Sequence, residues 1–314
     1  MKSTFETFKT MISNVIVGKE AEIELMMIAL LHGGHVLLES VPGTGKTMLA
    51  KTFAKCLHAD FQRIQFTPDV LPTDVTGMQF FNAKTQEFEL RPGPIMTNIL
   101  LADEINRATP RTQSSLLEVM EERQVTIDRE THLLKEPFMV IATQNPLESQ
   151  QGTFPLPAAQ LDRFFMKITM SYPSYEEEQE IIRRFRIKQP LEDISAVLSP
   201  AEIIEMKMRV REVYVSEDIE KYLLLIVRET RENPVIEIGA SPRATLALLR
   251  ASQGHAFIKG RNYVIPDDVK KVAPYVLIHR LSLTTEASLT KTMEQVFEAI
   301  FTAIPAPVEE GVSS

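Results

Sequence analysis

The amino-acid sequence predicts an α/β fold, in which a parallel sheet is flanked by helices and followed by an all-helical second domain. Two observations carry this prediction. Up to about residue 172, short apolar runs suited to buried strands alternate with helix-like stretches, the pattern of a parallel sheet. Beyond that point helix-capping sequences follow one another, and no convincing strand signal appears. A length of 314 residues also fits about two domains.

The first half of the chain contains five candidate strands. Continuous apolar runs, such as residues 99–102, are expected where a strand is buried on both faces of a parallel sheet. The predicted strands are residues 36–39, 61–66, 99–102, 138–143 and 165–170. Helices are expected at residues 21–31, 48–57 and 110–122.

The second half is predicted to form successive helices. Ser174 and Ser199 each stand three residues before a glutamate, which makes a capping box at the start of a helix. Further helices are predicted at residues 216–232, 241–257 and 266–280. We therefore expect a core at residues 1–190 and a helical domain at residues 191–305. The tail, residues 306–314, is rich in Pro, Glu and Ser and is expected to be mobile.

Two segments interrupt the alternation of strands and helices. Residues 67–98 carry four prolines and precede the third predicted strand. Residues 124–137 alternate in polarity around an Asp-Arg-Glu turn, which predicts a hairpin. Insertions with structure of their own are often functional surfaces, and the alternative is that both merely decorate the fold.

A glycine-rich loop connects the first predicted strand to its helix. Gly43 and Gly45 allow backbone φ values that turn consecutive N–H groups toward a phosphate. The start of the following helix adds partial positive charge. Lys46 can reach the β- and γ-phosphates, and the Thr47 hydroxyl can ligate Mg²⁺. The loop therefore predicts nucleotide binding.

One position of this loop departs from the usual pattern. The pattern G-x-x-x-x-G-K-[ST] begins with glycine, and this chain has Ser40 there. A serine can close the turn if its φ is negative, so we expect an intact loop. The alternative is a glycine turn that binds nothing.

Two adjacent carboxylates, Asp103 and Glu104, follow the predicted strand at residues 99–102. The carboxyl end of a central parallel strand is where such sheets bind ligands. Asp103 is suited to hold Mg²⁺ through its water shell, and Glu104 to orient the attacking water. The alternative is a helix N-cap followed by a first-turn acid. Their position downstream of a phosphate loop favours the catalytic interpretation.

Three further polar residues are candidates, each with a plain structural alternative. Asn145 follows a strand, where its amide can contact a γ-phosphate or the lytic water, although a turn-forming Asn before Pro is the more frequent use. Arg163 is either a surface arginine paired with Asp162 or an arginine finger for a neighbour's nucleotide. Arg243 lies in a first helical turn, where a cation is unfavourable unless an anion is near, which favours a phosphate role.

The composition narrows the function classes. The net charge is −8 and no Lys/Arg block stands out, so constitutive nucleic-acid binding is not favoured. Cys56 is the single cysteine, which excludes an internal disulfide and a cysteine-based metal cluster. Residues 1–10 lack the apolar segment of a signal peptide, and the apolar runs are far too short to span a bilayer. We expect a soluble, cytoplasmic protein.

Six stretches of the chain together carry a family resemblance. They are IVGKE at residues 16–20, VPGTGKT at 41–47, ADEINRA at 102–108, ATQNP at 142–146, PLPAAQLDRF at 155–164 and ASPRA at 240–244. With them in place, the chain resembles the MoxR family of AAA+ ATPases almost from end to end. Together these stretches are far more specific than the phosphate loop alone.

The resemblance implies a role for each candidate residue. Contacts to ATP or ADP are implied for Val17 and Gly18 at the adenine and for Pro42, Gly43, Thr44, Gly45, Lys46, Thr47 and Met48 in the Walker A loop. Asp103 and Glu104 would form the Walker B pair, with Thr47 and Asp103 on Mg²⁺. Asn145 would be sensor 1, Arg163 the arginine finger and Arg243 sensor 2. Residues 67–98 would hold the helix-2 insert near the pore of a ring, and residues 124–137 the hairpin preceding sensor 1.

The resemblance also implies a function. It implies a hexameric Mg²⁺-dependent ATPase that acts like a chaperone in maturing or activating other protein complexes, often with partners that carry a von Willebrand factor A domain. One alternative is a nucleic-acid remodeller that grips DNA with Arg129, His132 and Lys135, although the interleaved acidic residues weaken that role. Another is a nucleotide-gated scaffold with little turnover, against which the intact Glu104 argues. The sequence names no client protein.

Overall fold

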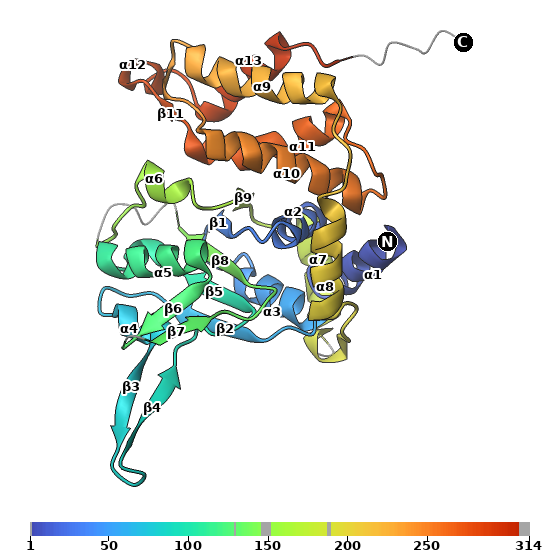
Figure 1. The fold of residues 1–314 in the computed structure, drawn as a ribbon. Coiled ribbons are helices and arrows are strands. Elements are labelled where there is room, and N and C mark those ends of the chain that lie inside the picture. Colours follow the sequence, from blue (N-terminus) through green and yellow to red (C-terminus); the bar gives the residue numbers. More distant parts are fainter. Residues whose placement is uncertain (1, 129, 146–151, 187–189, 308–314) are drawn as a thin grey trace.

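The computed structural model describes residues 2–128, 130–145, 152–186 and 190–307, and it is built around one parallel sheet (Figure 1). The sheet has five strands in the order β2-β5-β8-β1-β9, and each neighbouring pair is parallel. The strands are β1 (Val36–Ser40), β2 (Phe61–Gln65), β5 (Ile99–Asp103), β8 (Met139–Gln144) and β9 (Met166–Met170). This confirms the five predicted strands. Because all five run the same way, their carboxyl ends lie along one edge of the sheet.

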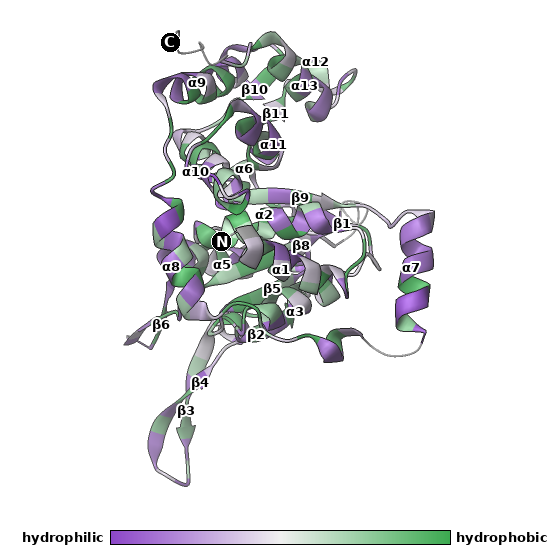
Figure 2. Ribbon diagram, turned by 90° about the vertical axis from the view of Figure 1, so that its right-hand side faces the viewer, coloured by the Kyte–Doolittle hydropathy of each residue, from purple (hydrophilic) through white to green (hydrophobic). Residues whose placement is uncertain are grey.

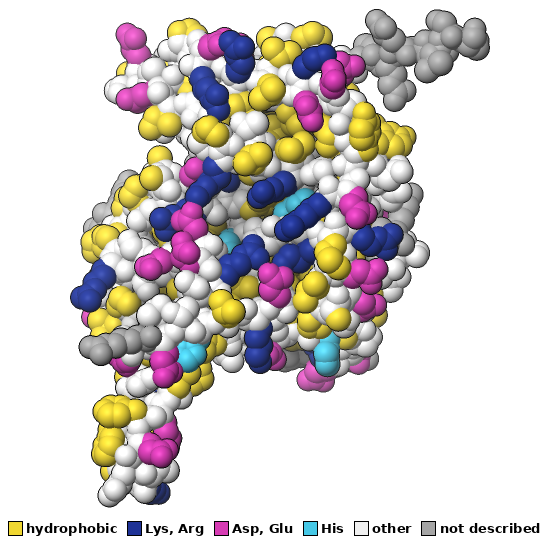
Figure 3. Space-filling model, in the orientation of Figure 1, with side chains coloured by type: hydrophobic (Ala, Val, Ile, Leu, Met, Phe, Trp, Pro, Cys, Tyr) yellow, Lys and Arg dark blue, Asp and Glu magenta, His cyan; other side chains and the backbone are white. Residues whose placement is uncertain are grey.

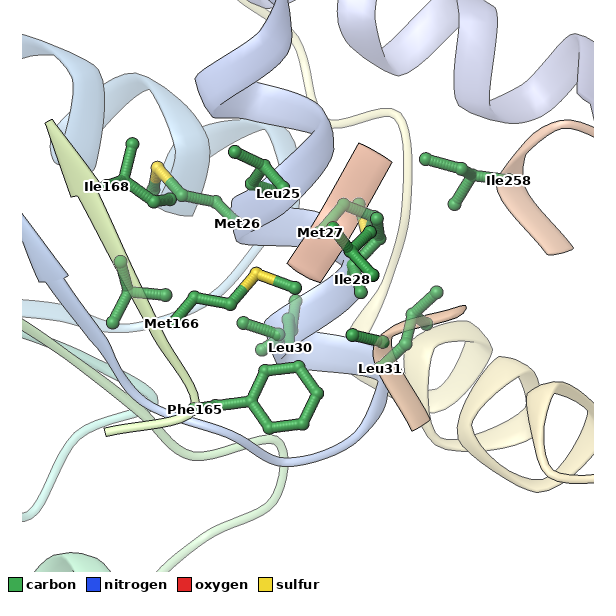
Figure 4. Packing of buried hydrophobic residues seen from close by; sticks show 14 of the residues in the cluster. Leu25, Met26, Met27, Ile28, Leu30, Leu31, Phe165, Met166, Ile168 and Ile258 are labelled. Carbon is green, nitrogen blue, oxygen red and sulfur yellow. The ribbon is translucent and has the colours of Figure 1, made fainter. Parts of the chain in front are cut away.

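Helices cover both faces of this sheet. Successive strand residues point to opposite faces, so Leu101 and Ile141 belong to one buried cluster and Leu100 and Val140 to another. The first cluster includes α1 (Lys2–Ser13), α2 (Glu20–Leu31) and α3 (Lys46–Cys56), and the second includes α5 (Pro110–Glu122). Figure 4 shows side chains of α2 packed against Met166 of β9.

The two interrupting segments form separate hairpins. After α4 (Pro72–Thr76), strands β3 (Gly77–Asn82) and β4 (Glu87–Pro92) pair antiparallel and extend away from the core (Figures 1 and 2). Strands β6 (Gln124–Ile127) and β7 (Glu130–Leu133) form the predicted second hairpin. A short 3-10 helix, η1 (Ile105–Arg107), follows β5.

The C-terminal half is helical, as the sequence predicts. Its helices are α6 (Ala158–Leu161), α7 (Tyr175–Phe185), α8 (Pro200–Val210), α9 (Glu217–Glu232), α10 (Pro242–Ile258), α11 (Pro266–Leu277), α12 (Thr285–Ser288) and α13 (Met293–Ala303), with 3-10 helices η3 (Pro190–Asp193) and η4 (Ile278–Arg280). The predicted capping serines Ser174 and Ser199 each accept a hydrogen bond from the backbone N–H three residues on, and both capping boxes are complete.

One correction concerns strands in this half. Strands β10 (Ile236–Ile238) and β11 (Ser282–Leu283) form a small antiparallel ribbon, where the sequence predicts none. With three and two residues they are too short to show a period of two, and each depends on a partner far along the chain. Of the tail at residues 306–314, only residues 306 and 307 lie among the described residues.

The helical half is packed directly on the core. Helix α10 crosses α2, and apolar residues of both belong to one buried cluster that also reaches α9 and α11. Helix α2 is apolar almost all round. It packs on β9 on one side and on α10 on the other, so most of its surface is buried. Within the described part of the chain, no helix has the length and apolar character needed to cross a bilayer.

Candidate nucleotide site

The glycine-rich loop lies at the carboxyl end of β1 and leads directly into α3. Gly43 and Gly45 take left-handed conformations, with φ values of 83° and 85°. A Cβ built on either glycine would meet no atom within 4 Å, so the space over the loop is open. Gly45 is the N-cap of α3, which begins at Lys46. The loop thus presents a helix N-terminus and an open backbone cradle, as a phosphate requires.

Ser40 occupies the place of the usual first glycine without backbone strain, although its buried Oγ has no hydrogen-bond partner among the described residues. It is the last residue of β1, is paired with Met170 of β9 and is almost fully buried. Its φ does not lie in the left-handed region, in contrast to the φ of Gly43 and Gly45. The condition under which a serine closes this turn is therefore met.

A small cleft of ≈ 210 Å³ adjoins the loop. Its lining includes Gly43, Thr44, Gly45 and Met48 together with Val17. Much of the remaining wall is apolar, including Ile181 and Phe185 of α7, which suits the faces of a base. Gly18 follows Val17 with a φ of 70°, so the backbone turns sharply beside the cleft. The structure brings Val17 and the loop residues together.

Asp103 and Glu104 lie at the same edge of the sheet as the phosphate loop, at the end of β5, which pairs directly with β8. Asp103 is the last residue of β5 and is buried. Its Oδ1 accepts a hydrogen bond from Thr143 Oγ1 at 2.6 Å, and its Oδ2 accepts one from Arg63 at 2.7 Å. No helix-capping bond involves its side chain, so the N-cap alternative does not hold for Asp103.

Glu104 has an unusual backbone conformation. Its φ and ψ are 58° and 50°, a left-handed conformation that costs a non-glycine residue about 1–3 kcal/mol. The Glu104 N–H donates to Thr143 Oγ1 at 2.8 Å, which helps to hold this conformation. The Glu104 carboxylate lies 3.1 Å from Arg107 and is partly exposed at this edge. Strain of this kind is concentrated at functional sites.

Asn145 joins this group from the neighbouring strand. It directly follows β8, which lies between β5 and β1 in the sheet, and it is buried. Asn145 follows the carboxyl end of β8, the two carboxylates lie at that of β5, and the phosphate loop follows that of β1. Pro146, which follows Asn145 in the predicted turn, lies outside the described residues.

Arg163 and Arg243 lie at the opposite edge of the sheet. Arg163 precedes β9, and Phe165 N–H donates to the carbonyl of His35, just before β1 begins. The five residues of β1 span about 16 Å at about 3.3 Å per residue, which separates this edge from the phosphate loop. Arg163 Nε lies 3.3 Å from Glu121 Oε2, and Arg243 pairs with the other oxygen, Glu121 Oε1. One chain therefore brings the two arginines together, away from its own loop.

These arginines line a second cleft, of ≈ 470 Å³, between α5 and α10. Its wall is strongly cationic, with side chains of Arg123, Arg163, Arg243, Arg250 and Arg280 against Glu121 and Asp162. Figure 3 shows Lys and Arg side chains gathered around a hollow below the C-terminal helices. Arg280 is buried against Asp162, and burial lowers the pKa of its guanidinium to about 10. The cleft is suited to an anion.

The predicted donors fit Mg²⁺ by their chemistry. Thr47 offers a hydroxyl and Asp103 a carboxylate, and Mg²⁺ prefers such hard oxygen ligands. Among the described residues there is no group of three or more His, Cys, Asp or Glu side chains that could hold a metal. Thr47 and Asp103 would hold such an ion together with phosphate oxygens and water, the usual ligands of Mg²⁺ beside a nucleotide.

Sequence reasoning missed three residues that the structure places in these sites. Thr143 joins Asp103 to Glu104, Arg63 pairs with Asp103, and Glu121 joins the two arginines. The only sequence signal for Thr143 is a hydroxyl at the end of an apolar strand. Arg63 and Glu121 carry no local signal, because their partners come from other elements.

Comparison with known proteins agrees with this architecture. Residues 35–166 match the ATPase family associated with various cellular activities (AAA), and residues 228–300 match the AAA lid domain. A crystal structure of a Cytophaga hutchinsonii protein superposes with a TM-score of 0.91 at 39% sequence identity, covering 98% of this chain and 96% of the other. The fold and the phosphate loop thus define an AAA ATPase core followed by its lid.

Two relatives place the chain more closely. The uncharacterized protein YeaC of Bacillus subtilis is 49% identical over 95% of this chain and 93% of its own length. Chaperone MoxR1 of Mycobacterium tuberculosis is 44% identical over 88% of this chain and 75% of its own length. The chain belongs to the MoxR family of AAA ATPases, a membership that implies ATP binding and hydrolysis.

Proposed function

We propose that this protein uses Mg²⁺-dependent ATP hydrolysis to remodel or activate protein complexes, with each active site shared by two copies of the chain. The proposal of a shared site is supported by the distance, within one chain, between the phosphate loop with its carboxylates and the two arginines. The phosphate loop, Asp103 and Glu104 lie at the carboxyl edge of the sheet, while Arg163 and Arg243 lie at the amino edge. A ring of copies, hexameric by resemblance, would set the arginines of one beside the loop of the next.

The roles proposed for the residues follow from their positions. Lys46 and Thr47, at the start of α3, hold the phosphates and Mg²⁺, with Asp103 opposite. Glu104 orients the attacking water, and Asn145 contacts the γ-phosphate or that water. Val17, Gly18, Pro42, Thr44 and Met48 complete the nucleotide contacts. Arg163 and Arg243 reach the γ-phosphate from the neighbouring copy, where they stabilise the charge of the transition state.

A mixing experiment tests the shared site. Lys46→Ala should abolish ATP binding and Arg163→Ala should abolish hydrolysis, so each variant alone is inactive. In a random equal mixture, an Arg163→Ala chain can supply the intact phosphate loop and a neighbouring Lys46→Ala chain the intact Arg163. About a quarter of the sites should then become active. If Arg163 served its own nucleotide, every chain in the mixture would stay defective and no activity would return. Unchanged hydrolysis by Arg163→Ala alone would also refute the role.

Work on a protein client is supported by a second observation. The β3–β4 hairpin extends from the core and exposes Phe81 and Phe88, whose rings pack edge to face with centroids 5.4 Å apart. MoxR1 is named a chaperone. We propose that the hairpin contacts the client, and that a protein with a von Willebrand factor A domain is one candidate partner. Co-purification with the Glu104→Gln variant in ATP identifies the client, and retention without ATP as well would count against ATP-driven remodelling.

The described residues of the second hairpin give no specific support to nucleic-acid binding. His132 lies 3.9 Å from Glu130, and Arg129 is outside the described residues. Glu136 is held between Lys207 and Arg123, and these cations lower the pKa of its carboxyl. The hairpin region therefore mixes both signs of charge instead of presenting a cationic face.

A further inference from the structure

The carboxylate of Glu121 is the meeting point of two arginines that come from different parts of the chain. Glu121 lies near the C-terminal end of α5 in the core. Arg163 precedes β9 in the core, whereas Arg243 belongs to the first turn of α10 in the lid. Each arginine pairs with a different oxygen of this one carboxylate.

This arrangement holds two like charges close together. Two guanidinium groups repel each other, and a carboxylate between them offsets that repulsion. The other carboxylate of the cleft, Asp162, is already engaged by Arg280 at 2.7 Å and by Ser241 at 3.1 Å. Glu121 is thus the carboxylate of this cleft wall that holds Arg163 and Arg243 as a pair.

The pairing leaves donors of both arginines available. Arg163 uses Nε and Arg243 uses one Nη nitrogen, so each guanidinium keeps other N–H groups for a ligand. Both side chains are partly exposed, at 33% and 50%. The pair carries two positive charges against one negative charge, and a γ-phosphate can take up the excess. Two guanidinium groups held in fixed positions suit phosphate recognition, because each can donate two parallel N–H hydrogen bonds to phosphate oxygens.

We infer that Glu121 is the positioning residue that fixes Arg163 and Arg243 as a single two-arginine clamp for the neighbour's γ-phosphate. The inference rests on the proposed shared site, and it adds that the lid is coupled to the core finger through this carboxylate. Loss of the Glu121 charge separates the two arginines and misplaces both. The defect then appears in the neighbour's turnover and leaves this chain's own nucleotide binding unchanged.

Glu121→Gln tests this, because glutamine keeps the shape and removes the charge. In the homogeneous variant kcat should fall about tenfold or more, since small misplacements of a positioning group are costly, while the KM for ATP stays within about twofold. Glu122→Gln, on the same helix and outside the cleft wall, is the matched control and should behave as the parent protein. Glu121→Asp, which restores the charge, should recover part of the loss.

The decisive measurement places Glu121→Gln on one side of the shared site at a time. Lys46→Ala chains supply arginines to Arg163→Ala chains in the mixing experiment. Adding Glu121→Gln to the Lys46→Ala donor should reduce the recovered activity about tenfold, and adding it to the Arg163→Ala acceptor should have no effect. An equal loss on both sides, or no loss in the donor, overturns the inference. Failure of the unmodified pair of variants to complement would instead refute the shared site itself.

Discussion

Thr143 Oγ1 donates a hydrogen bond to Asp103 Oδ1 at 2.6 Å, across the pair of central strands β5 and β8. Because a hydroxyl has one proton, the same oxygen is left to accept from the Glu104 N–H at 2.8 Å. One side chain thus orients the proposed metal-binding carboxylate and holds the left-handed backbone of the proposed catalytic glutamate. We therefore expect substitutions of Thr143 to affect catalysis.

Thr143→Val should lower turnover while nucleotide affinity is largely kept. Valine has nearly the shape of threonine but leaves the Asp103 oxygen and the Glu104 N–H without this partner, and such misplacement can cost about 10²-fold in rate. Steady-state phosphate release gives kcat, and fluorescent nucleotide titration gives the dissociation constant. Thr143→Ser, which keeps the hydroxyl, is the control. A Thr143→Val protein with parental kcat would show that the hydroxyl is not needed.

Glu104→Gln should bind ATP normally and hydrolyse it about 10²–10⁴-fold more slowly, the usual contribution of a positioned general base. The glutamine keeps the size of the side chain but cannot accept a proton from water. ATP binding by calorimetry and phosphate release by the same preparation separate the two effects. Parental turnover in this variant would remove Glu104 from the proposed mechanism. Turnover that is negligible in the parent protein would instead favour the nucleotide-gated scaffold.

Substitutions in the phosphate loop should differ sharply with backbone conformation. Gly45→Ala places a Cβ at a φ of 85°, which costs about 1–2 kcal/mol of strain, and ATP affinity should fall about tenfold or more. Ser40→Gly restores the usual pattern at a residue already in extended conformation, so affinity should change less than about twofold. Titration with ATP compares the two variants. A large gain of affinity in Ser40→Gly would mean that the serine impairs the loop.

Stability should fall as the pH decreases from neutral, and buried His35 is one cause. The Val140 N–H donates to His35 Nδ1 at 2.9 Å and Nε2 lies 3.0 Å from the Met120 carbonyl, a pattern that only the neutral ring satisfies. Burial lowers the pKa of His35 from 6.5 to about 4. Below pH 6.5 His35 is protonated in the unfolded chain but stays neutral in the folded protein. The contribution of His35 to the free energy of unfolding is therefore lost as the pH falls from about 6.5 to 4.

The expected slope from His35 approaches about 1.4 kcal/mol per pH unit in that range. His32, whose pKa burial lowers to about 3, and His279, whose pKa is lowered well below its usual value, add in the same direction. Chemical denaturation between pH 5 and 8 measures the free energy of unfolding. In His35→Gln the slope below pH 6.5 should be shallower, although the variant starts less stable. Equal slopes in both proteins would exclude the contribution of His35.

Local patterns accounted for most of the fold. Strands β1, β5 and β8 are recognisable because each is an apolar run buried on both faces, whereas β2 and β9 show only a partial apolar pattern. Ser174 and Ser199 mark helix starts because a capping box lies within four residues. The ribbon of β10 and β11 was not predictable, because five residues in total give no period and each strand depends on the other. The same limit applies to Arg63, whose partner Asp103 lies on the adjacent strand.

By itself the sequence determined the phosphate loop, the succession of strands and helices along the chain and the identity of the polar residues at strand ends. Each of these depends on neighbours within a few positions. Only the tertiary structure decided which of those residues meet. Arg163 and Arg243 are 80 positions apart and share Glu121 because α10 packs on α2 and its first turn reaches the C-terminal end of α5. Their distance from the phosphate loop follows from the parallel strands, which place the starts and the ends of all five at opposite edges of the sheet.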